Sequence, residues 1–298
     1  MRDEATGPAL RPEVLRFPRP DGGLDLVDPV CDRLLRLDAE EAKGLERLEE
    51  GEPEPALRAR LETALLLEGP AAQLLRREWY RGRTHRVVPP PAPGEPAPPF
   101  APLDAPGVAS RWRDPEALRR LAEERRAGRE VLVLRGFCAP TWTSALADAV
   151  RRLPLERLET PLVRAARARV DRDALPELFD LLEAPGLART VSALLGVSLG
   201  PRLEVNAWRL GPGDAMGVHP DGPEYSATFS LGLTRDWTAE LGGAIAFGEP
   251  TDDGLAVRER FCPHAGDLCL FAPSARSWHA VERVASGERW SITGWWTR

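Results

Sequence analysis

A proline-rich stretch, Val87-Val-Pro-Pro-Pro-Ala-Pro-Gly-Glu-Pro-Ala-Pro-Pro-Phe100, divides this chain and limits what it can fold into. Proline cannot donate a backbone hydrogen bond to a sheet and fixes its own φ, so such a stretch favours an extended, semi-rigid spacer. We therefore expect a small unit over residues 1–86, a linker over residues 87–107 and a larger domain over residues 108–298.

The composition narrows the class of protein. The chain has 298 residues, of which 43% are hydrophobic and 29% charged, as in a soluble globular protein. Its formal net charge of -6 gives no electrostatic support for a nucleic-acid partner. No apolar run approaches the length of a membrane span, the N-terminus lacks a signal-peptide hydrophobic region, and the four cysteines lack metal-site spacing. We expect a cytoplasmic protein that binds neither nucleic acid nor membrane.

The first of two motif blocks ends in His219-Pro-Asp221. Side chains two residues apart on extended backbone point to the same side, so this pair can share a metal ion. His279, from a distant strand, would complete a set of two imidazoles and one carboxylate. That set suits non-haem Fe(II) with positions open for a co-substrate and dioxygen, whereas catalytic zinc, the competing metal, usually keeps one open position. We expect His264 to lie in a loop away from the metal.

The second block carries a candidate anion-binding residue. Arg289 lies ten residues after His279, a separation that a β-hairpin can bring back alongside the metal ligands. Its guanidinium is permanently charged and can form two parallel bonds to a carboxylate. Ser291, on the same strand face, can add a hydroxyl bond.

From about Leu203 to Trp296, the chain resembles the Fe(II)- and 2-oxoglutarate-dependent dioxygenases of the prolyl-hydroxylase-like branch. The resemblance is carried by Gly211-Pro-Gly213, Ala227-Thr-Phe229, Leu233-Thr-Arg-Asp-Trp237, Gly242-Gly-Ala-Ile-Ala-Phe247, Gly266-Asp-Leu-Cys-Leu-Phe271 and Gly287-Glu-Arg-Trp-Ser-Ile-Thr-Gly-Trp-Trp296. It implies a double-stranded β-helix, the jelly-roll or cupin-like barrel, with helices on its outer face. It also implies three iron ligands, His219, Asp221 and His279, and a pairing of Arg289 with the distal carboxylate of 2-oxoglutarate.

One position departs from that family. Many prolyl hydroxylases have a tyrosine three residues before the first ligand, and this chain has Met216. We expect Thr228 or Trp208 to complete the cofactor pocket in its place. Trp278, beside a ligand, is a candidate for lining the substrate pocket.

The first 86 residues predict strands followed by helices. Val14–Phe17, a turn at Asp21-Gly-Gly23 and Leu24–Val27 indicate a β-hairpin, and Leu34–Leu37 indicates a third strand. Asp38 and Glu41 form a capping box that predicts a helix to about Leu48. Further helices are expected over residues 55–67 and 71–80. The order is that of a small winged-helix-like α/β domain.

This unit resembles the peptide-recognition domains of the pyrroloquinoline-quinone chaperone type, over Leu24–Ala42. In those domains a leader peptide adds as a strand to the sheet edge. A structural cap or a dimerisation module is the alternative. A DNA-binding winged helix is disfavoured by the acidic stretch from Glu46 to Glu54.

The segment between the linker and the motif blocks predicts outer elements of the barrel. Helices are expected over residues 115–127 and 141–153, with one or two more over 174–195, and a buried strand over 130–135. Arg164, Arg167 and Arg169 form a basic patch, either a solvated face or a site for an acidic substrate. The remainder predicts the short strands of a jelly roll, giving an α+β fold class.

The resemblance to the dioxygenases implies an enzyme that hydroxylates an unactivated carbon, using Fe(II), 2-oxoglutarate and dioxygen. The expected substrate is a peptidyl side chain, with proline first and aspartate or asparagine next, in a protein or a ribosomal peptide precursor. A free amino acid or small metabolite is the alternative substrate. The alternative from another class is a non-catalytic peptide-binding protein with a degenerate barrel.

Overall fold

The computed structural model describes residues 8–11, 14–28, 33–69, 99–159, 162–251 and 254–298. The chain divides into two compact units, one of residues 1–82 with 160–162 and one of residues 83–159 with 163–298. The helix expected over residues 71–80 and most of the expected linker, residues 87–98, lie outside the described residues.

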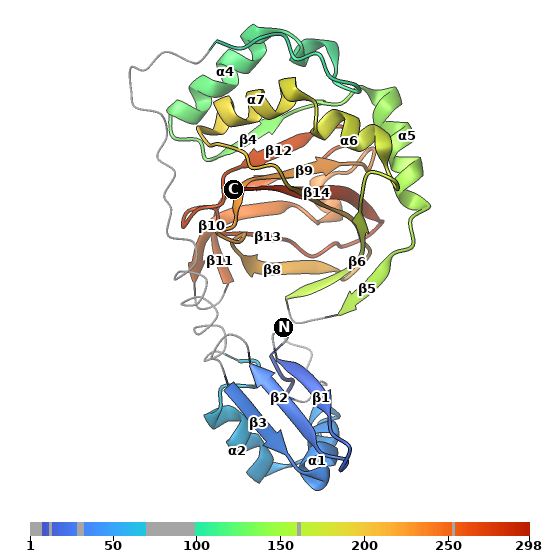
Figure 1. Cartoon of the computed structure of the whole chain (residues 1–298), viewed down its shortest axis with the longest axis vertical. Helices are drawn as coiled ribbons and strands as arrows, with labels where there is room; N and C mark the ends of the chain where they lie inside the picture. Colours follow the sequence, from blue (N-terminus) through green and yellow to red (C-terminus); the bar gives the residue numbers. More distant parts are fainter. Residues whose placement is uncertain (1–7, 12–13, 29–32, 70–98, 160–161, 252–253) are drawn as a thin grey trace. The chain divides into compact units, whose positions relative to one another are not determined.

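The smaller unit contains a three-stranded antiparallel sheet in the order β1-β2-β3 (Figure 1). The strands are β1 (Leu15–Pro18), β2 (Leu24–Asp28) and β3 (Arg33–Leu37), close to the predicted segments. One face carries Leu26 and Leu37, which are buried in the unit's core. The other face carries the exposed side chains of Leu15, Phe17 and Leu34.

Two helices follow this sheet, α1 (Ala39–Glu49) and α2 (Pro55–Thr63). The predicted capping box is present, because Asp38 accepts hydrogen bonds from the backbone of Glu40 and Glu41 while Glu41 reaches back to Asp38 N. The second helix ends before the predicted residue 67. Leu65 adopts a left-handed conformation, φ 58°, that an α-helix cannot continue through. This small α/β domain has the strand and helix order expected from the sequence.

The larger unit is built on an 11-stranded sheet that curls into two facing parts. One part is β7 (Leu203–Leu210), β14 (Arg289–Thr297), β9 (Tyr225–Gly232), β12 (Leu268–Phe271) and β4 (Val131–Leu134), in that order. The other is β8 (Ala215–His219), β13 (His279–Val281), β10 (Ile245–Thr251) and β11 (Gly254–Phe261). β6 (Val163–Val170) pairs with both β7 and β8 and joins the parts, and β5 (Glu156–Glu159) pairs with β6. This is the predicted double-stranded β-helix.

Helices cover the outer face of the part of the sheet that contains β7, β14, β9, β12 and β4 (Figure 1). They are α4 (Pro115–Arg126), α5 (Pro140–Arg151), α6 (Pro176–Leu182) and α7 (Pro185–Leu195), and short 3-10 turns are formed by Ser110–Trp112 and Ala239–Leu241. Their apolar sides form one core with the outward residues of the strands, such as Phe229, Leu270 and Ile292. Burial of this apolar area is the main contribution to the unit's stability.

The packed core of the larger unit begins earlier than residue 108. Phe100, Leu103 and Ala105 are buried in it, although they fall in the stretch expected to be linker. Proline spacing alone did not reveal this, because the apolar residues between the prolines find a surface to pack on only in the folded structure.

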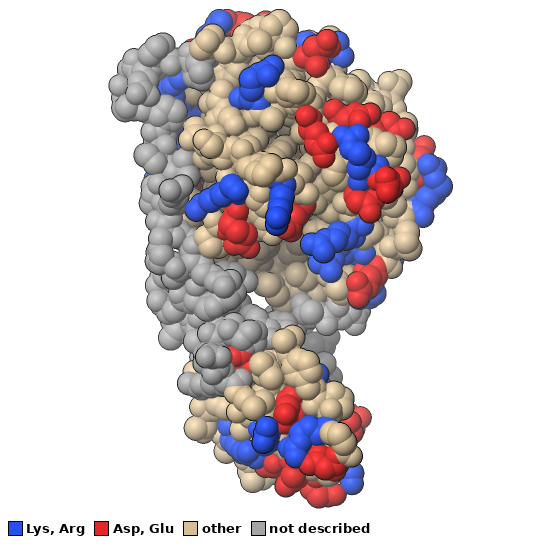
Figure 2. All heavy atoms as spheres, viewed as in Figure 1, with Lys and Arg blue, Asp and Glu red and all other residues tan. Residues whose placement is uncertain are grey.

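A second cluster of buried side chains fills the inside of the barrel. It contains Trp208, Phe247, Cys269, Phe271 and other residues that alternate along the strands with the outward ones. Charged side chains of both signs are interspersed on the face shown in Figure 2. None of the described helices is both long and apolar enough to span a membrane.

Candidate metal centre and co-substrate site

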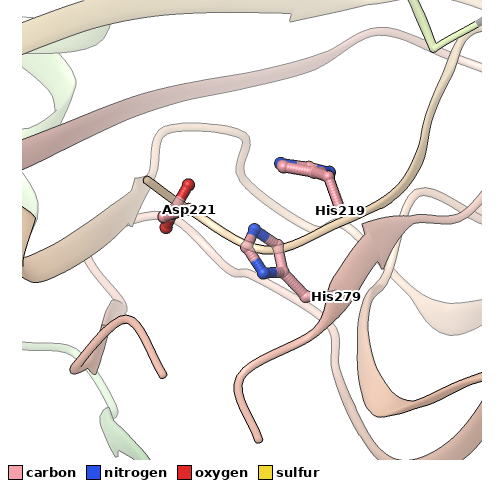
Figure 3. A group of neighbouring side chains, drawn as sticks. All are labelled: His219, Asp221 and His279. Carbon is pink, nitrogen blue, oxygen red and sulfur yellow. The ribbon is translucent and has the colours of Figure 1, made fainter. Parts of the chain in front are cut away.

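The antiparallel pairing of β8 with β13 brings two distant histidines together. His219 ends β8, His279 begins β13, and the two are register partners with ring centroids 4.4 Å apart. Asp221 follows β8 by two residues. Figure 3 shows the three side chains converging from these two segments, and one donor atom of each lies within 4.8 Å of the others. Among the described residues, no other group of His, Cys, Asp and Glu side chains converges in this way.

The hydrogen bonds of both imidazoles leave the same ring nitrogen available. His219 Nδ1 lies 2.8 Å from the carbonyl oxygen of Gly217, and His279 Nδ1 lies 2.8 Å from that of Ser277. A carbonyl only accepts, so each Nδ1 carries the proton and donates it. Each Nε2 then keeps its lone pair, the arrangement typical of metal-binding histidines.

Burial keeps one of these imidazoles neutral. His279 is buried against Phe247 and Phe271, with ring centroids 5.4 and 5.0 Å from its own. Burial first, and then the neighbouring His219, lower the pKa of His279 to about 4. At neutral pH the imidazole is therefore uncharged, with a proton on Nδ1 alone, and the uncharged ring is the form that binds a metal.

The carboxylate of Asp221 is held by a hydroxyl. Thr228, on β9, donates from Oγ1 to Asp221 Oδ2 at 2.6 Å, and both side chains are buried, at 2% and 6% exposure. This bond occupies one carboxylate oxygen and fixes its plane, leaving Oδ1 for a metal ion. The Thr228 hydroxyl is thus directed at Asp221, whereas the sequence had made it a candidate cofactor contact.

Arg289 is a buried cation without a complete set of partners. It begins β14, is 2% exposed, and its Nε has no hydrogen-bond partner. Burial lowers the pKa of Arg289 to about 10, which still leaves it protonated at neutral pH. Gly243 makes room for it, since a Cβ there would lie 3.0 Å from Arg289 Cδ. A buried charge of this kind needs an anion, and a carboxylate fits the guanidinium.

The remaining residues that the sequence had singled out differ in burial and in their strand partners. Ser291 is buried on the same strand face as Arg289, and its register partner on β7 is Trp208. Trp278 is 3% exposed, so its contact with a substrate stays a prediction. Met216 lies on β8, half-buried, opposite Val163 and Val281. His264 is exposed in the loop before β12, as expected.

One group of residues near the site could not be recognised as a group from the sequence. Trp295, on β14, is the register partner of Thr228 on one side and of Glu204 on the other. Its ring packs on Tyr225 at 5.6 Å, and the Tyr225 hydroxyl donates to Glu204 Oε2 at 3.0 Å. Only strand register reveals this group, because its members lie far apart in the sequence.

Comparison with known proteins identifies the class. Residues 204–297 match the family model of the 2OG-Fe(II) oxygenase superfamily. A prolyl-4-hydroxylase from Pseudomonas putida aligns with 60% of this chain and 98% of its own, at 23% identity and a TM-score of 0.50. A Trichoplax adhaerens prolyl hydroxylase, solved with a peptide fragment of hypoxia inducible factor, aligns with 61% of this chain and 91% of its own, at 16% identity and a TM-score of 0.51. No curated protein matches the chain.

The fold and the matched segment define a 2-oxoglutarate-dependent dioxygenase, which uses Fe(II), 2-oxoglutarate and dioxygen. Residues 204–297 of the C-terminal domain are similar to the 2OG-Fe(II) oxygenase superfamily, and the domain shares its fold with prolyl hydroxylases.

Proposed function

We propose that this protein hydroxylates an unactivated carbon of a peptidyl residue, proline first and aspartate or asparagine next, in a protein or a ribosomal peptide precursor. The observation that carries the proposal is the buried guanidinium of Arg289, with an unpartnered Nε, in the same barrel as the His219, Asp221 and His279 group. This combination fits a chelated keto acid whose far carboxylate needs a buried cation.

Each residue has a distinct role in the proposal. Nε2 of His219, Nε2 of His279 and Oδ1 of Asp221 would hold Fe(II), a ligand set that suits an iron ion that also binds a co-substrate and dioxygen. Arg289 binds the distal carboxylate of 2-oxoglutarate, and Ser291 donates a hydroxyl bond to it. When bound, the iron with 2-oxoglutarate and dioxygen supplies the oxidant, and the co-substrate leaves as succinate and carbon dioxide. The barrel residues orient these groups and exclude water.

The peptide substrate is supported by two observations. The Trichoplax neighbour was solved with a peptide fragment bound. In this chain, the outer face of the smaller sheet exposes Leu15, Phe17 and Leu34 at 48%, 50% and 54%. Leu15 and Leu34 are both register partners of Val27, so they form an apolar row across the sheet, and β1 and β3 are the edge strands of this sheet among the described residues. Such a surface suits an extended peptide.

An anaerobic titration tests the proposal. Fe(II) and then 2-oxoglutarate are added to metal-free protein, and the weak visible charge-transfer band of a chelated keto acid is expected. A colourless protein that binds zinc tightly would instead indicate a hydrolytic or structural metal site. Succinate release in air, stimulated by peptides and not by free amino acids, then separates the peptide substrate from the metabolite alternative.

The Thr228 hydroxyl provides a prediction on metal binding. Thr228→Val keeps the shape of the side chain and removes the hydrogen bond to Asp221 Oδ2. Loss of an outer-shell bond of this kind typically lowers metal affinity by about 10–100-fold, and calorimetry with Mn(II) measures it. Thr228→Ser should restore most of the affinity. Thr190→Val, at a buried threonine of α7, is the matched control, and an equal loss there would exclude a local role for Thr228.

The apolar row of the smaller unit provides a prediction on substrate length. The double variant Leu15→Ser with Phe17→Ser should raise the KM of long peptide substrates by about tenfold, because two exposed apolar anchors are lost. Short peptides should keep their KM. The exposed Arg58→Ala on α2 is the control. A KM for long peptides that stays at the wild-type value in the double variant would remove this unit from substrate binding.

We also infer that the protein acts in the cytoplasm. The thiols of Cys138, Cys262 and Cys269 are free. Free thiols fit a reducing compartment.

A further inference from the structure

The basic patch noted in the sequence, formed by Arg164, Arg167 and Arg169, lies on β6. Because side chains alternate along a strand, its arginines lie on opposite faces of the sheet. Ala165 belongs to the cluster inside the barrel, whereas Ala168 belongs to the outer, helix-covered core. Because strand side chains alternate, Arg167 and Arg169 share the inward face with Ala165, and Arg164 lies on the opposite face. Arg167 is half-buried there, and its guanidinium carbon lies 5.8 Å from the centre of the Trp208 ring.

Arg167 differs from Arg157, Arg169 and Arg209 in having no acidic partner among the described residues. Arg157 makes two bonds to Asp214, at 2.8 and 2.7 Å. Arg209 lies 3.6 Å from Glu288, and Arg169 lies 3.9 Å from Glu204. In the described part of the chain, no carboxylate lies within ion-pair distance of Arg167. Glu156, the register partner of Arg167 on β5, forms no ion pair with it. The charge on the inner face of β6 is therefore available to a ligand.

The chemistry of this position selects a carboxylate. A guanidinium over an indole keeps its N–H groups free at its edge, and that planar edge matches the two oxygens of a carboxylate. In the proposed function, Arg289 is already occupied by 2-oxoglutarate. We propose that Arg167 binds a carboxylate of the peptide substrate, from an Asp or Glu side chain or from the chain end. This inference rests on the proposed function and names its substrate class.

The sheet order gives the spacing between this carboxylate and the reacting carbon. Arg167 lies on β6, and Thr228, which holds Asp221, lies on β9, three strands away in the order β6-β7-β14-β9. Three strand spacings amount to about 14 Å across the sheet. The row of Arg167 runs through Trp208 and Ser291 to Gly232, four residues from Thr228 along β9, which adds about 13 Å along the strand. The two positions are thus about 20 Å apart, and since an extended peptide covers about 3.5 Å per residue, the acidic group should lie roughly five to seven residues from the hydroxylated one.

A peptide series tests the proposal. Each peptide of the first set contains one proline and one Asp, placed one to eight residues away on either side. The second set has Asn in place of Asp at the same positions. A third set ends in either a free or an amidated C-terminus. Peptide-stimulated succinate release should show a KM about tenfold lower for Asp than for Asn at five to seven residues. The C-terminal set shows whether a chain-end carboxylate serves as well. Arg167→Gln should remove the preference and leave kcat unchanged, whereas Arg164→Gln on the opposite face should retain it.

The same variants distinguish the two possible failures. An absent charge-transfer band in the wild type overturns the proposed function. If the band forms and the wild type binds Asp and Asn peptides equally, the carboxylate subsite is wrong while the oxygenase assignment stands. A preference that survives in Arg167→Gln also overturns the subsite. Anaerobic calorimetry on the protein loaded with Mn(II) and 2-oxoglutarate measures peptide binding directly. Peptides that bind but are not hydroxylated therefore still test whether Arg167 binds their carboxylate.

Discussion

Asp221→Ala should lower Fe(II) affinity at least about 100-fold, because loss of a direct ligand exceeds the 10–100-fold effect typical of outer-shell groups. It should also abolish succinate release. The substitution removes the only carboxylate of the converging group and leaves the Thr228 hydroxyl without its acceptor. Anaerobic calorimetry measures the affinity, and the charge-transfer band should be absent at Fe(II) concentrations that saturate the wild type.

Asp214→Asn is the matched control for that variant. Asp214 is also buried and lies seven residues earlier, but it pairs with Arg157 and belongs to no converging group. Burial alone would raise the pKa of Asp214, yet the hydrogen bonds from Arg157 and from the Gly211 backbone outweigh it and lower the pKa. Its substitution should reduce stability and spare metal affinity. Unchanged Fe(II) binding in Asp221→Ala would show that Asp221 is not a ligand.

The barrel and the convergence of its site residues could be predicted because their signals are local or repeat in a fixed order. The His219 and Asp221 pair follows from its spacing on extended backbone, and the Asp38 capping box is complete within four residues. The hairpin expected between His279 and Arg289 is not formed, because β13 pairs with β10 and β8 whereas β14 pairs with β7 and β9. Apolar residues at helical spacing predicted the helices of the larger unit, and short apolar runs bounded by turn residues predicted the three strands of the smaller unit and β4.

Other features depend on contacts between segments distant in the sequence. The bond of Thr228 to Asp221 requires β9 to lie beside the end of β8, and the inward face of Arg167 is set by β6 pairing with β7 and β8. The left-handed Leu65 is fixed by packing, since leucine does not favour that conformation. No window of the sequence contains both partners of such contacts.

Arg289→Met should weaken 2-oxoglutarate binding about 100-fold or more, the effect expected on removing one partner of a desolvated charge pair, about 3 kcal/mol. The KM for 2-oxoglutarate in succinate release measures it, and Fe(II) affinity should be unchanged. The KM of Arg289→Lys for 2-oxoglutarate should lie between those of the wild type and Arg289→Met, because lysine keeps the charge and loses the planar pair of donors. Arg209→Gln, on the outward face of β7, is the control.

The stability of the Arg289→Met variant separates a binding role from a structural one. In the ligand-free protein this guanidinium is buried, its Nε is unpartnered, and burial has lowered its pKa to about 10. A buried charge in that condition destabilises the fold, so replacing it by an apolar side chain of similar length should leave the melting temperature of the apo protein unchanged or raise it. Addition of 2-oxoglutarate with Mn(II) should raise the melting temperature of the wild type and not that of the variant. A clear loss of apo stability in Arg289→Met would mean that the arginine already has partners that hold the barrel together, and the anion site would have to lie elsewhere.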